Sequence, residues 1–256
     1  MSLDVAASSG RSHCARVHEA GSLRVRFPHA GGQGLEAILV NTAGGIAEGD
    51  RFDIAADIGR DARLVVTTAA AEKIYRSLGA TSALDMRFRV EEGGGLVWVP
   101  QETILFDAAR LRRTIEVNAH AAAHIVIAEM LVFGRTAMGE AVIDGSLFDR
   151  WRIRRGGKLT FAETIRLDDD IAKRLGARAV AAGGVAAVTI FVMPATDEAV
   201  SLVRDLTPGL RSEVAASAWN GFAVIRLLAA DAAALRADFA SVLLALQVPL
   251  PRLWLN

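Results

Sequence analysis

One alternating stretch decides the fold class. Residues 84–90 read LDMRFRV, so apolar and charged side chains follow one another strictly, and the turn EEGGG follows at 91–95. Strict alternation is typical of a strand with one buried face and one face in water. Shorter alternating segments lie on both sides of this stretch, at 52–54, 115–117, 151–154 and 164–167. The first two thirds of the chain are therefore predicted to be mainly β.

The turns between these segments recur with a loose period. Ile58, Val90 and Ile153 each precede a five-residue turn that ends in another apolar residue, and Val117 begins a longer version. Turns of this kind between alternating segments are typical of hairpins or of the corners of a coil. The spacing of about 30 residues indicates a stacked, solenoid-like β architecture. A plain β-sandwich is the alternative.

Helical signals are confined to the C-terminal part of the chain. Thr196 can cap a first helix, which Thr207-Pro208-Gly209 ends. Asp231 can cap a second helix, which Pro249 stops. We therefore expect two α-helices near the C-terminus of a mainly β protein.

Length and composition exclude several classes of protein. The chain has 256 residues and is 52% hydrophobic, with 29 Lys+Arg against 29 Asp+Glu. Intrinsic disorder is excluded, because it requires low hydrophobicity and high net charge. A general nucleic-acid binder normally carries a basic excess, so no nucleic-acid partner is expected. The single Cys14 excludes an internal disulfide framework and a zinc site built from cysteines.

The chain shows no sign of a linker or of a membrane segment. We expect one domain over residues 1–256, with residues 1–14 poorly ordered. The N-terminus lacks an apolar core of signal-peptide length. The longest uncharged run, 179–196, contains glycines and a proline, which favours a buried strand over a transmembrane helix. A cytoplasmic protein without a membrane partner is predicted.

Four segments carry more glycine and polar residues than a core requires. They are NTAGGIAEGD at 41–50, TTAAAEKIY at 67–75, PQETILFD at 100–107 and EMLVFGRTAMGE at 129–140. The first could form a phosphate loop, but it lacks the GxxxxGK[ST] pattern, and a tight turn is the alternative. The patterns GxSxG, HExxH, HxH and CxxC are missing. His120 and His124 lie four residues apart in a strand-and-turn region, so histidine-based metal chemistry is not favoured.

Individual residues in these segments admit more than one role. Lys73 and Tyr75 would share one face of a strand, where they could form a catalytic pair or a structural contact. Glu102 could be a metal ligand, a general base or a buried partner for an arginine. Arg135 and Glu140 could pair across a glycine-containing turn.

Taken together, the four segments resemble the urease accessory protein UreD family, which is called UreH in some organisms. The resemblance is carried, in the family's order, by 41–45, 49–51, 67–68, 73–76, 98–106, 133–135, 139–140 and 149–152. It extends from about Arg11 to the C-terminal helix. Ala43 and Glu48 stand where the family usually has proline and glycine, which leaves the local turn geometry open.

The resemblance implies a maturation factor and not an enzyme. Members form a complex with UreF and the GTPase UreG, dock on apo-urease and help to insert nickel into its active site. The lack of a P-loop in this chain agrees with a scaffold role. The resemblance also implies a passage for transient nickel, with no tightly bound cofactor. Four acids are the candidates for lining that path or holding an interface: Asp50, Glu102, Glu129 and Glu140. Three other residues are expected to fix the scaffold around them: Lys73, Tyr75 and Arg135.

An enzyme remains the alternative. A β-fold hydrolase or lyase could use Glu102 and Glu129 as general acid and base. That function requires both carboxyl groups to line one open cleft. A carbohydrate- or peptide-binding module is disfavoured, because aromatic residues make up only 6% of the chain.

Overall fold

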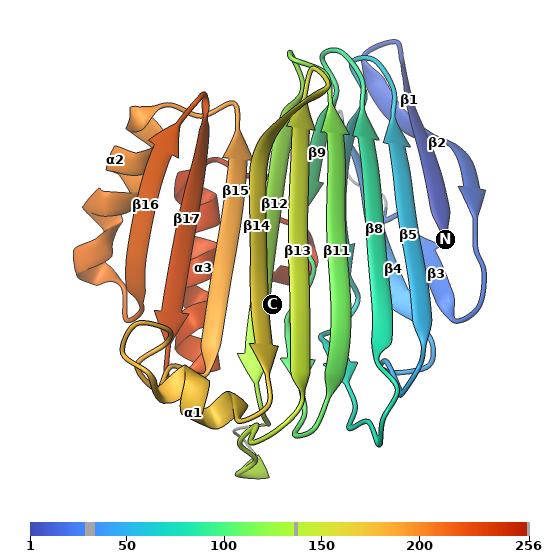
Figure 1. The fold of residues 1–256 in the computed structure, drawn as a ribbon. Coiled ribbons are helices and arrows are strands. Elements are labelled where there is room, and N and C mark those ends of the chain that lie inside the picture. The colour runs from blue at the N-terminus through green and yellow to red at the C-terminus, as the bar shows by residue number, and fades with distance from the viewer. Residues whose placement is uncertain (29–33, 136–137, 255–256) are drawn as a thin grey trace.

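The chain folds into two large β-sheets that face each other (Figure 1). The structure is a computed structural model that describes residues 1–28, 34–135 and 138–254. The strands are β1 (Ser2–Ser8), β2 (Arg11–His18), β3 (Leu23–Arg26), β4 (Leu35–Asn41), β5 (Arg51–Ile58), β6 (Arg63–Thr68), β7 (Glu72–Ile74), β8 (Ser82–Val90), β9 (Gly95–Trp98), β10 (Thr103–Leu105), β11 (Arg110–Ala119), β12 (His124–Phe133), β13 (Ser146–Arg155), β14 (Lys158–Asp168), β15 (Ala186–Met193), β16 (Glu213–Trp219) and β17 (Phe222–Ala229). The α-helices are α1 (Ile171–Gly176), α2 (Asp197–Leu206) and α3 (Ala232–Ala245).

The two sheets are built from stacked coils. The front sheet of Figure 1 has the order β14-β13-β11-β8-β5-β1-β2, and the back sheet has the order β16-β17-β15-β12-β9-β6-β4-β3. Strands β5, β8, β11 and β13 are parallel neighbours in the front sheet, and β4, β6, β9 and β12 are parallel neighbours in the back sheet. Each coil therefore adds one strand to each sheet. This confirms the solenoid-like architecture predicted from the sequence.

Three of the four recurring turns are corners of these coils. The turns after Ile58, Val90 and Val117 each carry the chain from the front sheet to the back sheet. Successive corners stack, because the amide of Glu91 donates to the Ile58 carbonyl at 2.9 Å and the amide of His120 donates to the Val90 carbonyl at 2.8 Å. The turn after Ile153 differs, since it joins the antiparallel strands β13 and β14 as a hairpin.

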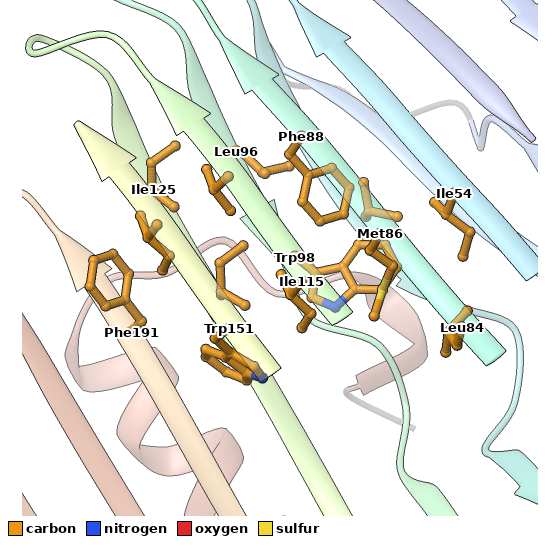
Figure 2. Packing of buried hydrophobic residues seen from close by; sticks show 14 of the residues in the cluster. Ile54, Leu84, Met86, Phe88, Leu96, Trp98, Ile115, Ile125, Trp151 and Phe191 are labelled. Atoms are coloured by element: carbon orange, nitrogen blue, oxygen red, sulfur yellow. The ribbon is translucent and has the colours of Figure 1, made fainter. Parts of the chain in front are cut away.

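The apolar phase of the alternating strands fills the space between the sheets. Figure 2 shows side chains of both sheets meeting there, including Phe88 of β8 and Trp98 of β9, whose ring centroids lie 5.1 Å apart. Burying side chains of this size contributes about 1.5–3 kcal/mol each to the free energy of unfolding. A charged side chain in this phase is therefore an exception that needs a partner.

Two of the three α-helices lie where the sequence predicts them. Helix α2 begins after Thr196 and α3 begins after Asp231. Helix α3 packs on β15 and β17 and covers part of the outer face of the back sheet (Figure 1). The sequence did not indicate α1, which has only six residues and is too short to show a helical period. Among the described residues, no helix is long and apolar enough to cross a membrane.

The N-terminus differs from the prediction of poor order over residues 1–14. Strand β1 pairs with β5 in parallel and with β2 in antiparallel, so both strands extend the front sheet. The physical reason is that Leu3 and Val5 are buried in the main core. Their alternation with polar neighbours is a strand signal too short to stand out in the sequence.

Candidate functional site

A cluster of three charged side chains lies inside the solenoid. Arg113 of β11, Glu129 of β12 and Asp149 of β13 are only 1%, 3% and 2% exposed. Arg113 donates to Asp149 through Nε to Oδ1 at 3.0 Å and through Nη2 to Oδ2 at 2.6 Å, and its Nη1 donates to Glu129 Oε2. Trp98 Nε1 donates to the other oxygen of Glu129 at 2.6 Å, and Thr103 Oγ1 accepts from Arg113 at 3.3 Å. The cluster therefore joins strands of both sheets.

The charges of this cluster do not balance. Burial raises the pKa of the Glu129 carboxyl, and the neighbouring Asp149 raises it further, although Arg113 and the Trp98 hydrogen bond lower it. Burial alone would lower the pKa of Arg113, but the two carboxylates together raise it, so the guanidinium stays charged. One guanidinium thus serves two carboxylates. The ionised cluster carries one excess negative charge, which a proton or a cation could neutralise.

Two cavities meet at the cluster. The larger has a volume of about 180 Å³ and is lined by Asn41, Glu72 and Gln101 as well as by Arg113 and Glu129. Asn41 Nδ2 donates to Glu72 Oε1 at 3.1 Å, and burial raises the pKa of the Glu72 carboxyl. Most of the lining of the larger cavity is apolar, and Asn41, Glu72, Lys73 and Gln101 belong to its polar part.

The smaller cavity lies beyond the cluster. It has a volume of about 20 Å³, enough for about one water, and is lined by Arg113, Glu129, Asp149 and Glu163, among others. Glu163 pairs with Arg226, whose side chain is 53% exposed. A row of polar side chains thus runs through the interior, and Arg113 and Glu129 are common to both cavities.

The segments selected from the sequence meet where the chain returns from the back sheet to the front sheet. Tyr75 donates from its hydroxyl to the Gly44 carbonyl at 3.1 Å, and a Cβ at Gly45 would overlap the Tyr75 ring, so glycine is required there. The Tyr75 ring packs edge-on against Phe106, with centroids 5.2 Å apart, and the Arg135 guanidinium lies 4.3 Å from the centroid of Phe106. Hydrogen bonds therefore combine with aromatic packing to tie loops that are far apart in the sequence.

Of the four candidate acids, only Glu129 lines the interior cavities. Asp50 caps a turn by accepting from the Ala47 amide at 2.8 Å. Glu140 pairs with Arg135 at 2.8 Å through both of its oxygens, which confirms that predicted pair. Glu102 pairs with Arg236 of α3, which is the last of the three roles that the sequence left open for it. The structure does not bring the four acids together on one path.

Lys73 and Tyr75 flank the buried Ile74, so they do share one side of the chain. Tyr75 holds the loops together as described above. Within the described residues, the Lys73 side chain makes no ion pair, although its backbone carbonyl accepts from the Ile46 amide at 2.7 Å. Tyr75 and Arg135 are thus held against the same ring, that of Phe106, and Lys73 is not.

The geometry argues against Glu102 and Glu129 as an acid and base pair. Glu129 shares the inner face of β12 with Ile127 and Leu131, which belong to the core between the sheets. Glu102 instead contacts Arg236 of α3, which covers the outer face of the back sheet. The two carboxyl groups lie on opposite faces of one sheet and do not line a common cleft.

Sequence reasoning missed Glu72, Arg113, Asp149 and Glu163. A signal existed for Arg113 and Asp149, because each stands in the apolar phase of its strand, as in Leu111-x-Arg113-x-Ile115. A charge in that phase predicts a buried, paired group. Among the residues that the structure describes, no group of three or more His, Cys, Asp or Glu side chains is placed to hold a metal ion.

The fold and the site define a class of protein: a two-sheet β-solenoid with a charged cluster in its interior. The chain belongs to the UreD urease accessory protein family, whose sequence profile matches residues 1–255. It is 52% identical over 256 residues to urease accessory protein UreD of Rhodopseudomonas palustris strain BisA53, covering 100% of this chain and 90% of that protein. It is 49% identical over 253 residues to urease accessory protein UreD of Bradyrhizobium diazoefficiens, covering 99% of this chain and 92% of that protein. This membership supports a role in urease maturation.

Proposed function

We propose that this chain is a non-catalytic maturation factor that binds UreF and the GTPase UreG, docks with them on apo-urease in the cytoplasm, and assists the insertion of nickel. Membership of the UreD family supports the maturation role. The observation that carries the nickel step is the charge cluster between two interior cavities, in which Glu129 and Asp149 share one guanidinium. Such a cluster favours the arrival of a cation.

The donors along the row suit nickel as a cargo. Carboxylate oxygens are ligands that Ni²⁺ accepts, and transit requires weak sites, not a closed cage of ligands. A cation in the larger cavity would have the carboxylates of Glu72 and Glu129 as its acidic neighbours. Its charge could replace that of Arg113 on Glu129, and Arg113 could then remain with Asp149, to which it makes two hydrogen bonds.

The proposal is tested by co-purification. The tagged chain is expressed with and without UreF and UreG from the same source, and the product is sized by light scattering. We expect a soluble, stoichiometric complex that forms when UreF is present. A well-behaved lone protein that binds neither UreF nor UreG would contradict the proposal.

A further inference from the structure

The outer face of the front sheet is open. Figure 1 shows this sheet toward the viewer, and none of the described α-helices crosses it, because α2 and α3 lie behind with the back sheet. The buried residues of β13 alternate with Arg150, Arg152 and Arg154, so these arginines point outward. Arg110 of β11 lies in the outward phase of the neighbouring strand.

Charges on this face are distributed unevenly. Toward β5, the outward charges pair across strands, with Arg87 at 2.8 Å from Asp53 and Arg89 at 3.6 Å from Asp57. Strand β13 instead presents three arginines in a row and no acid in the same phase. Successive outward residues of a strand are about 6.6–6.8 Å apart, so these like charges repel one another. The formal net charge of the whole chain is zero, so its composition does not explain the excess.

The arginines of this row are poorly satisfied by the chain itself. Over the part of the chain that the structure describes, Arg150 has only Glu116 as a charged partner, at 3.5 Å, and Arg152 donates only to the backbone carbonyls of Trp151 and Glu163. Within the described residues, Arg154 makes no side-chain hydrogen bond or ion pair, and the Nε atoms of Arg110 and Arg150 are buried without a partner. We call Arg110, Arg150, Arg152 and Arg154 the arginine face.

We propose that the arginine face is a docking surface for a protein partner that presents a row of carboxylates. This proposal deepens the proposed function, on which it rests, by naming the surface that one of the protein partners uses. The guanidinium fork binds carboxylates in a bidentate manner. All four side chains are half-buried, so less side-chain freedom is lost on binding than for extended arginines.

A protein fits this face better than a nucleic acid. Asp85, Glu116 and Asp168 lie on or beside the same face and would repel phosphates. A nucleic-acid surface would also be expected to carry a general basic excess, which the chain lacks. The acids Asp85 and Glu116 instead lie on the neighbouring strands β8 and β11, and such complementary charges can set the register of a specific protein interface.

The test compares two triple variants with equal loss of charge. The first is Arg150→Gln, Arg152→Gln and Arg154→Gln. The control is Arg16→Gln, Arg51→Gln and Arg89→Gln, which removes three arginines from β2, β5 and β8 of the same sheet. Binding of each variant to UreF, to UreG and to apo-urease is measured separately by titration, at about 50 mM and about 300 mM NaCl. Circular dichroism establishes that each variant is folded.

We expect the first variant to lose at least about tenfold in affinity for one of the three proteins, while the control stays within about twofold of the wild type. The wild-type affinity for that protein should also weaken with salt, and more steeply than that of the first variant. If the triple variant fails to fold, Arg154→Gln and the salt series carry the test.

If the first variant binds all three proteins as tightly as the wild type does, the docking surface is overturned and the proposed function is unaffected. A wild-type chain that binds none of the three would instead overturn the proposed function, and the docking surface with it. A 20-nucleotide RNA that binds the wild type more tightly than any of the three proteins, and loses affinity in the first variant, would replace the protein partner by a nucleic acid.

Discussion

Arg113 is the single counter-charge that the buried carboxylates of Glu129 and Asp149 share, so its loss affects both of them. Its removal would leave Glu129 and Asp149 buried without a counter-charge. We expect Arg113→Leu to lower the free energy of unfolding by about 3–5 kcal/mol, measured by chemical denaturation.

The matched control is Arg112→Leu. Arg112 is the preceding residue of the same strand, pairs with Asp85 on the outer face, and has a side chain that is 39% exposed. A surface pair of this kind contributes about 1 kcal/mol or less. Equal losses in the two variants would contradict the burial of the Arg113 charge.

The raised pKa of Glu129 has a defined consequence for stability. In the unfolded chain this carboxyl loses its proton near pH 4.3, the usual value for glutamate, whereas in the folded chain it holds the proton to higher pH. The folded state therefore binds more protons in this window, and the contribution of Glu129 to stability falls as the pH rises.

Glu129→Gln removes this titration. We expect the free energy of unfolding of the variant, relative to the wild type, to increase between pH 4.5 and pH 7, as measured by denaturation at a series of pH values. A constant or decreasing difference would show that Glu129 is ionised throughout.

The sequence predicted part of this cluster and could have predicted more. Glu129 was selected because it stands in a polar-rich segment, but the same reasoning selected Asp50, Glu102 and Glu140, which lie elsewhere. The phase of a residue within its strand separates these cases, because it tells which face the side chain is on. Which strands come together across the core is a non-local property, so the partners of Arg113 could not be derived from spacing alone.

At the scale of elements, the two predicted helix caps differ in what they do. Asp231 accepts a hydrogen bond from the Ala233 amide at 2.9 Å, whereas the side chain of Thr196 makes no capping bond. We expect Asp231→Ala to lower the free energy of unfolding by about 1 kcal/mol. Thr196→Ala serves as the control and should cost clearly less. Chemical denaturation of both variants measures the difference, and equal costs would mean that the Asp231 bond contributes nothing.

The turns show where a local pattern ceases to be informative. The sequence predicted turns at four places but left open whether each was a hairpin or a corner. The turns after Ile58 and Val90 are corners, and the turn after Ile153 is a hairpin, although all three are similar in length and composition. Whether a turn forms a hairpin or a corner depends on which strand is available for pairing. The packing of the whole coil determines which strand that is.

At the scale of the whole molecule, the corners of successive coils stack on one another, so they recur along the chain at similar intervals. The loose period in the sequence therefore predicted the stacked coils. The N-terminal strands were not predicted to be ordered, because their order comes from pairing at the sheet edge with β5. The proposed function depends on this global arrangement, since only the stacking of β11, β12 and β13 brings Arg113, Glu129 and Asp149 together. We propose that the interior row of polar side chains serves the delivery of nickel.

The most direct test measures the nickel content of urease. Apo-urease is activated with UreF, UreG and either the wild-type chain, Glu129→Gln or Glu102→Gln, and nickel per active site is determined after purification. Glu102→Gln is the matched control, because it alters a carboxylate that pairs with α3 and lies outside the interior cavities. We predict that all three chains form the complex, and that Glu129→Gln lowers the nickel content severalfold while Glu102→Gln leaves it near the wild-type level. Full nickel loading by Glu129→Gln in an intact complex would contradict the account.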